Sequence, residues 1–124
     1  QLNPYAQSKL VRVLEGTILD IAVDIRKGSI TFGKCFSLEL SEANRKQLFI
    51  PPGFAHGFSV LSETATVLYK CDKLFNSEIE AGIRYNDTTL KIDWKIPAGK
   101  EIVSEKDAQL PLFENCRNNF EFAG

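Results

Sequence analysis

Residues 49–58 read FIPPGFAHGF and contain the only histidine of the chain, His56. Two prolines and two glycines interrupt this stretch, so it cannot form a long helix. The apolar residues on either side, 47–50 and 57–61, have the composition of β-strands. We therefore expect a Pro-Gly turn between two strands. His56 lies where the second strand resumes, a position that directs its imidazole into a barrel or sandwich.

The strand pattern continues in both directions along the chain. Further strands are predicted at 9–14, 17–26, 34–40, 65–71, 82–86 and 92–96. The other expected features are a turn at 41–44 capped by Ser41, a short helix that starts at Ser104 and ends before Pro111, and a poorly defined polar tail from residue 114. Many short strands with little helix are typical of an antiparallel sandwich or jelly roll. The sequence predicts an all-β fold that forms a single domain over residues 1–124.

Strand 17–26, TILDIAVDIR, places two carboxylates on one face and only apolar residues on the other. Asp20 and Asp24 share their face with small residues, which is unusual for a strand with a simple solvent side. A buried carboxylate needs a partner. Two interpretations stay open: both carboxylates pair with Arg26, Arg12 or Lys34, or one of them orients His56. These three cations lie on the strand of the carboxylates or on neighbouring strands.

Composition restricts the partners of the chain. The 124 residues are 44% hydrophobic and 25% charged, which is ordinary for a globular protein, and the formal net charge is −1. This charge predicts no bulk attraction to nucleic acid or to an anionic membrane, so an anionic ligand needs a few placed cations. No apolar run approaches the roughly 20 residues of a membrane helix. Three scattered cysteines without a CxxC pair are expected to be free thiols of a reducing compartment, the cytoplasm.

Few single residues or motifs of the chain indicate catalysis or metal binding. A metal centre in a small β-barrel needs two or three histidines, and this chain has one. The GxSxG motif and the phosphate-binding glycine loops are absent. We therefore expect neither a metal nor an organic cofactor. A lone histidine is usually structural, Tyr69 fits a core-edge tyrosine, and Lys9 fits a solvated strand residue.

Read together, five blocks resemble the dTDP-4-dehydrorhamnose 3,5-epimerase family, cupin-fold enzymes of nucleotide-sugar biosynthesis. The blocks are KLVRV at 9–13, GTILDIAVDIRKGSITFG at 16–33, LSEANRKQLFIPPGFAHGFSVLSE at 40–63, LYK at 68–70 and SEKDAQLP at 104–111. The resemblance implies a cupin jelly roll and a homodimer without metal or cofactor. It also implies inversion at C3 and C5 of dTDP-4-dehydro-6-deoxy-D-glucose, which gives dTDP-4-dehydro-L-rhamnose.

The same resemblance assigns roles to six residues, and charge alone adds two more candidates. It places Lys9 at the enolate oxygen, Tyr69 as the acid, and Asp107 as the aspartate that holds the catalytic histidine. His56 and Asp20 correspond to a supporting pair in the pocket. The remaining candidates bind the nucleotide: Phe75 lies near a position that stacks on the base, and Lys106 and Arg12 are candidate phosphate neighbours on charge alone.

One departure from the family pattern concerns the base. In the family the base is a histidine of an LRGLHxQ segment upstream of KLVRV, and Gln1 resembles the glutamine of that segment. The chain also contains no methionine. We therefore expect a product truncated at its N-terminus, weak or inactive as it stands, with exposed sheet edges. The alternatives are an epimerase of a single centre, an isomerase of a neighbouring dTDP sugar, a non-catalytic dTDP-sugar-binding cupin and a metal-dependent cupin oxygenase.

Overall fold

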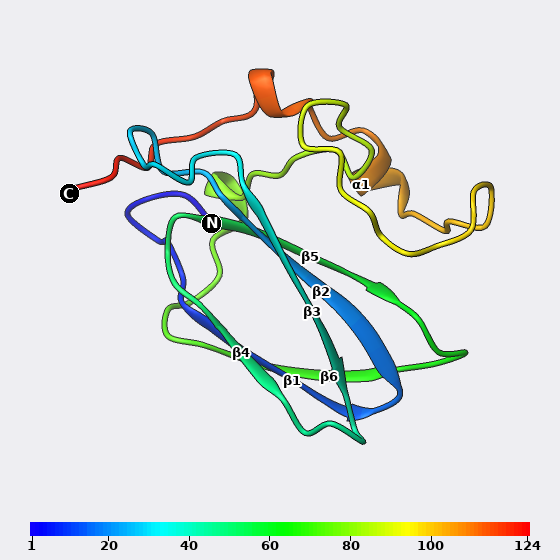
Figure 1. Cartoon of the computed structure of the whole chain (residues 1–124). Helices are drawn as coiled ribbons and strands as arrows, with labels where there is room; N and C mark the ends of the chain where they lie inside the picture. The colour runs from blue at the N-terminus through cyan, green and yellow to red at the C-terminus, as the bar shows by residue number, and fades with distance from the viewer.

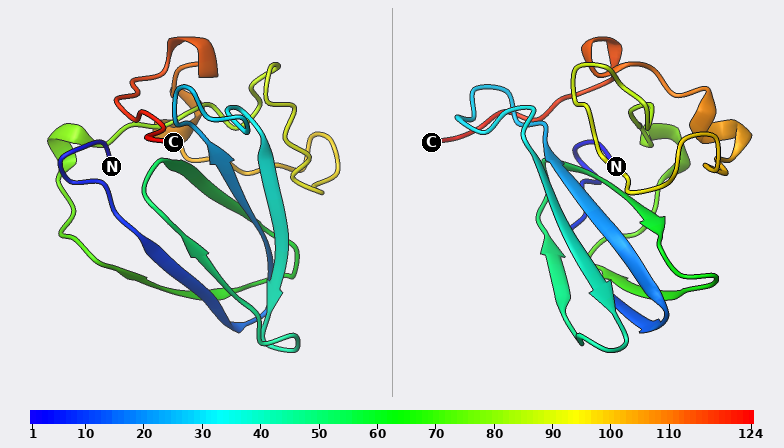
Figure 2. Two further views of the ribbon diagram at one scale, coloured as in Figure 1. Left: turned by 60° about the vertical axis from the view of Figure 1, so that its left-hand side comes forward. Right: turned by 45° about the vertical axis from the view of Figure 1, so that its right-hand side comes forward.

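A computed structural model describes residues 1–124 as two antiparallel sheets of three strands each (Figure 1). Sheet A has the order β4-β1-β6, formed by β4 (Gln47–Ile50), β1 (Lys9–Glu15) and β6 (Thr66–Cys71). Sheet B has the order β3-β2-β5, formed by β3 (Cys35–Ser41), β2 (Thr17–Asp24) and β5 (Phe54–Val60). The two sheets face each other, and a layer of irregular chain covers one end of sheet B (Figure 2). The predicted all-β fold is confirmed.

Helical structure is confined to three short pieces. They are η1 (Ser77–Ile79), α1 (Glu105–Ala108) and η2 (Phe113–Asn115). Ser104 caps α1, because its Oγ accepts a hydrogen bond from the backbone N–H of Asp107 at 3.1 Å. The predicted helix start is therefore confirmed. None of these helices has the length and apolar character needed to cross a membrane.

Two strands are shifted from their predicted bounds. β2 ends at Asp24 rather than residue 26, because the Asp24 carboxylate accepts the backbone N–H of Arg26 at 3.0 Å and turns the chain out of the sheet. β5 starts at Phe54, since residues 54–60 pair with β2 without a break. His56 is consequently the third residue of a continuous strand and does not lie at its beginning.

The predictions of strands at 82–86 and 92–96 and of a poorly defined tail are wrong. Residues 80–104 lie on sheet B as irregular chain, held by side chains: the indole N–H of Trp94 donates to the carbonyl of Tyr85 at 2.8 Å. The tail is also anchored. Phe120 is buried, and the side-chain amide of Asn118 donates to the carbonyl of Ile25 at 2.6 Å. Neither segment forms a β-ladder, and the tail makes only an isolated β-bridge between Lys27 and Glu121.

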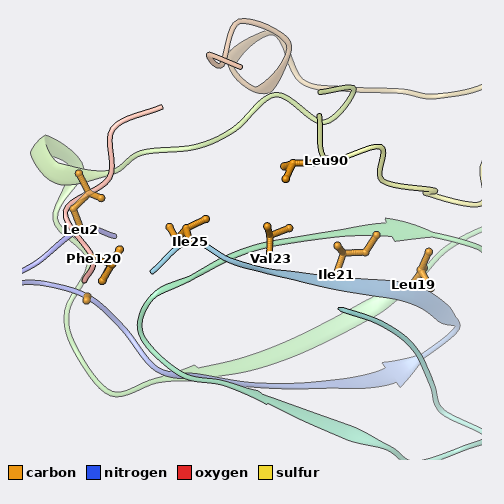
Figure 3. Packing of buried hydrophobic residues seen from close by; sticks show 8 residues of the cluster. Leu2, Leu19, Ile21, Val23, Ile25, Leu90 and Phe120 are labelled. Atoms are coloured by element: carbon orange, nitrogen blue, oxygen red, sulfur yellow. The ribbon is translucent and has the colours of Figure 1, made fainter. Parts of the chain in front are cut away.

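The alternation of β2 creates two hydrophobic clusters, one on each face of sheet B. Its odd-numbered apolar residues pack against the irregular layer, and Figure 3 shows them in a row with Leu90 above: Leu19, Ile21, Val23 and Ile25. The even-numbered positions face sheet A. There Ile18 and Ala22 pack with Val11, Val13 and other residues of sheet A. Both faces of β2 are therefore packed, one against the irregular layer and one against sheet A. Asp20 and Asp24 lie on the face that is turned toward sheet A.

Gly16, in the turn between β1 and β2, occupies a position where a side chain cannot fit. Its φ is +82°, and an added Cβ would lie 2.2 Å from the carbonyl oxygen of Thr64. We expect Gly16→Ala to cost about 3 kcal/mol or more, because a left-handed alanine is strained and the clash is with backbone. Gly28→Ala is the matched control, since φ is +85° there and nothing lies within 4 Å. Urea unfolding of both variants tests this: equal losses would show that the Thr64 contact is irrelevant.

Candidate active site

Sheet A contributes an ammonium and a phenol to the space between the sheets. Val11 and Val13 of β1 are buried there, so Lys9 at the start of β1 shares their face. In the antiparallel register with β6, Lys9 lies opposite Cys71 and Val11 lies opposite Tyr69. Lys9 and Tyr69 are therefore diagonal neighbours on the inner face, within reach of long side chains. Tyr69 is 57% exposed, so its hydroxyl is accessible.

Sheet B contributes an imidazole held by a buried carboxylate. The His56 Nε2–H donates to Asp20 Oδ1 from β5 to the neighbouring β2. Asp20 is fully buried, and its Oδ2 has no partner, so this is the only hydrogen bond that the carboxyl group makes. With Nε2 engaged, Nδ1 is the ring nitrogen of His56 without a partner in the chain. The interpretation that one carboxylate orients His56 is confirmed for Asp20.

The second carboxylate, Asp24, is structural. It accepts hydrogen bonds from Nε and Nη2 of Arg26 at 2.9 and 2.8 Å and from the Ser29 hydroxyl at 2.7 Å. The hydrogen bonds from the Arg26 guanidinium hold the pKa of Asp24 well below its usual range. The same guanidinium lies 4.8 Å from the ring centre of Phe54 and 5.0 Å from that of Phe122. This cluster fixes the start of β5, two residues before His56.

Apolar side chains complete the inner face of sheet B around the His56–Asp20 pair. Phe58 lies opposite Asp20 in the register, and its ring centre is 6.5 Å from that of His56. Phe36 of β3 lies opposite Ala22, whose other neighbour is His56. Phe36 and Phe58 remain 54% and 43% exposed. We use the name cup for the inner-face residues Lys9 and Tyr69 of sheet A together with these residues of sheet B.

Trp94 supports the cup from behind, and the sequence analysis assigned it only to a strand. The hydroxyl of Ser59 on β5 donates to the Trp94 carbonyl at 2.7 Å. Gly57 leaves room for the indole, since a Cβ there would lie 3.1 Å from the Trp94 ring. Gly57 directly follows the only histidine and points away from the cup. A glycine at such a strand position indicates that another group packs closely against the outer face.

The expected residues outside the two sheets form no hydrogen bond or ion pair with the residues of the cup. Asp107 is an exposed residue of α1, and its carboxylate contacts none of Lys9, Tyr69, His56 or Asp20. Phe75 is 61% exposed in the loop after β6. That loop begins beside the start of β1, because the backbone N–H of Ser8 donates to the Asp72 carboxylate at 2.8 Å. The structure therefore places Lys9 and Tyr69 side by side on sheet A and joins His56 to Asp20 on sheet B, and Asp107 bonds to none of them.

The two candidate phosphate cations are not free in the cup. Lys106 pairs with Glu80 at 2.7 Å, and this hydrogen bond raises the pKa of the Lys106 ammonium. Arg12 is exposed on the outer face of sheet A, because it is three residues from Lys9 and strand side chains alternate. Arg12 therefore projects away from the cup, and its role as a phosphate neighbour stays a prediction.

The side chains of the cup suit proton transfer rather than metal chemistry or disulfide exchange. No group of three or more His, Cys, Asp or Glu side chains is placed to hold a metal ion. All three cysteines are free thiols, as predicted. The cup instead offers an ammonium and a phenol on one wall and an oriented imidazole on the other. Such groups move protons and stabilise negative charge on oxygen.

Comparison with known proteins gives a consistent result. The family model described as dTDP-4-dehydrorhamnose 3,5-epimerase matches residues 1–115. The chain is 49% identical over 107 residues to the dTDP-4-dehydrorhamnose 3,5-epimerase of Shigella flexneri, covering 86% of this chain and 58% of that protein. The crystal structure of the same enzyme from Elizabethkingia anophelis superposes with a TM-score of 0.90 at 54% identity, covering 92% of this chain and 62% of the other.

A third similar protein was solved with a sugar nucleotide. The epimerase of Legionella pneumophila in complex with dTDP-4-keto-L-rhamnose has a TM-score of 0.84 and 47% identity. The match covers 90% of this chain and 59% of that one. The chain thus spans about three fifths of the length of the relatives it matches.

Proposed function

Since this chain belongs to the dTDP-4-dehydrorhamnose 3,5-epimerase family, we propose that its cup binds a dTDP-4-keto-6-deoxy sugar and takes part in inverting C3 and C5 beside the keto group. The single observation that carries this proposal is that Lys9 and Tyr69 lie on the face of sheet A that packs against sheet B, while the His56–Asp20 pair lies on the facing side of sheet B. Their chemistry matches what inversion next to a ketone requires.

The 4-keto group acidifies the hydrogens on both neighbouring carbons. A base removes a proton, the electron pair forms an enolate on the keto oxygen, and an acid returns a proton to the opposite face of the carbon. The reaction therefore needs a base, a cation or donor for the enolate oxygen, and an opposed acid. No external oxidant or reductant enters this balance.

Lys9 supplies the cation for the enolate oxygen. It is the first residue of β1 and shares the inner face with Val11. No carboxylate pairs with it, since the ion pairs of the chain involve Arg26, His56 and Lys106. An unpaired ammonium stabilises negative charge that develops on a substrate oxygen.

Tyr69 supplies the proton for the second half of the reaction. It lies opposite Val11 on β6, diagonal to Lys9, so the two side chains reach the same ligand from one wall. The phenol is 57% exposed and is a hydroxyl that can donate a proton. It is thus free to donate to a carbanion.

The His56–Asp20 pair forms the opposite wall and orients the keto sugar. Asp20 fixes the imidazole ring and leaves Nδ1 to the ligand. By the resemblance the base itself is a different histidine, in an LRGLHxQ segment that the 124 residues do not contain. We therefore expect the polypeptide of residues 1–124 alone to give no solvent-deuterium exchange at C3 or C5, while still binding dTDP sugars. Exchange by this polypeptide would make His56 the base.

Tyr69→Phe tests the assignment of the acid in the protein that carries this chain. We expect inversion to fall by about 10²-fold, because the phenol is the proton donor, while exchange of the abstracted proton falls much less. Product formation and deuterium incorporation are followed together by proton NMR. Tyr5→Phe is the control, since Tyr5 is a similarly exposed tyrosine outside the cup. Equal, mild losses of both rates would make Tyr69 a packing residue.

A further inference from the structure

A polar groove lies at the turn between β3 and β4, away from the cup. One cavity of about 280 Å³ is lined by Arg12, Val13, Leu14, Glu42, Arg45, Lys46 and Gln47. A neighbouring cavity of about 480 Å³ shares Glu42 and Arg45 and extends over Gly16, Thr17, Ser41 and Ala43. We call the two together the turn groove. Its turn is at the end of the sheets opposite to the irregular layer (Figure 1).

The turn groove concentrates cations that have no partner in the chain. Arg12, Arg45 and Lys46 are exposed, and none of their side chains forms an ion pair or a hydrogen bond. Glu42 is the only carboxylate among the lining residues. The groove therefore has a net charge of +2 in a chain whose net charge is −1. Closely placed cations repel one another, so an anion between them relieves this repulsion.

The backbone that carries two of these cations is braced from within. The Asn44 side-chain oxygen accepts the N–H groups of Ser41 and Lys46, both at 3.0 Å. The Asn44 backbone N–H donates to the Ser41 hydroxyl at 2.9 Å, and its side-chain amide donates to the Glu39 carbonyl at 2.9 Å. A fixed turn with free charged side chains needs little reorganisation to bind a ligand.

The groove also offers a backbone donor. The N–H of Ala43, which lines the larger cavity, donates to no acceptor in the chain. Two guanidinium groups, an ammonium and a free amide match the several oxygens of a phosphoryl group, because guanidinium binds such oxyanions through paired donors. The net charge of +2 favours a multiply charged phosphate over a single carboxylate.

We propose that the turn groove is a second anion site, which binds a phosphoryl group through Arg12, Arg45 and Lys46. The site is separate from the cup: Arg12 projects from the outer face of sheet A, and the cup is on the inner face. The site stands independently of the epimerase proposal. Its ligand is either free phosphate or diphosphate, or the diphosphate of a nucleotide.

The test is NMR titration of the chain with inorganic diphosphate at low ionic strength, followed by titration with dTDP. We expect backbone amide shifts at residues 42–47, and we expect added salt to weaken binding. Arg45→Asn removes one guanidinium and keeps the backbone, because asparagine tolerates the φ of 55° found at Arg45. We expect this variant to bind about tenfold more weakly or worse.

Lys91→Asn is the matched control. Lys91 is also an exposed cation with positive φ, 49°, and it lies outside the groove. Loss of binding in Arg45→Asn with retention in Lys91→Asn, at equal thermal stability, supports the site. Tighter binding of dTDP than of diphosphate at residues 42–47 identifies a nucleotide as the source of the phosphate, and equal binding identifies the free anion. Shifts confined to cup residues such as Lys9 and Tyr69, or equal weakening in both variants, overturn the proposal.

Discussion

Replacing Lys9 by methionine is expected to slow solvent-deuterium incorporation into the keto sugar by about 10²–10³-fold in the protein that carries this chain. Methionine keeps the length and apolar stem of the side chain and removes the charge. The enolate oxygen then loses its cation, so both proton abstraction and inversion slow down together. Binding of dTDP, which lacks the 4-keto sugar, should change little.

Lys70→Met is the matched control for this prediction. Lys70 lies on β6 between Tyr69 and Cys71, and alternation puts it on the outer face of the same sheet, where it pairs with Leu10 in the register. We expect the Lys70→Met variant to incorporate solvent deuterium into the sugar at a rate within about twofold of that of the unchanged protein. If Lys70→Met and Lys9→Met lose the same activity, the effect is a general loss of charge or stability, and Lys9 has no special role at the enolate.

Asp24→Asn is expected to lower the free energy of unfolding by about 3–5 kcal/mol at neutral pH. Asp24 is 1% exposed and forms a two-point ion pair with Arg26. The amide cannot balance the guanidinium, which is then left unpaired between Phe54 and Phe122. Asp93→Asn is the control, because Asp93 is exposed and accepts only a local hydrogen bond from Lys95.

The pH dependence of this loss has a definite sign. The pKa of Asp24 is lowered in the folded state, chiefly by the hydrogen bonds from Arg26, so its contribution is fully present above the unfolded pKa of about 3.9. As the pH falls below that value, the unfolded chain takes up a proton first and the contribution shrinks. Urea unfolding of both variants across this range should show the difference between Asp24→Asn and the unchanged chain narrowing towards acid pH. A difference that is constant with pH would contradict the ionic role.

Most of the two sheets could be predicted from the sequence because period-two alternation is a local signal. In β2 it correctly put Asp20 and Asp24 on one face and the apolar residues on the other. Alternation alone could not choose between His56 and a cation as the partner of each carboxylate. That choice depends on the register, which places Ala22 opposite His56 and lets the imidazole reach Asp20 across the strands.

The irregular layer could not be predicted, because its order comes from contacts distant in sequence. Residues 92–96 have strand composition, yet Trp94 is held by the Tyr85 carbonyl and by Ser59 of β5. The polar tail contains Phe120, which packs into the cluster on the outer face of sheet B. By contrast, the position of Arg12 was open to prediction, since an odd spacing from Lys9 on one strand means opposite faces.

The most direct test of the cup as an inversion site is proton NMR of dTDP-4-keto-6-deoxyglucose in deuterated water with the protein that carries this chain. We predict that the signals of the hydrogens on C3 and C5 disappear and that the product has the L-rhamno configuration at both carbons. Tight binding of the sugar nucleotide with both hydrogens retained would contradict an epimerase and identify a protein that only binds dTDP sugars.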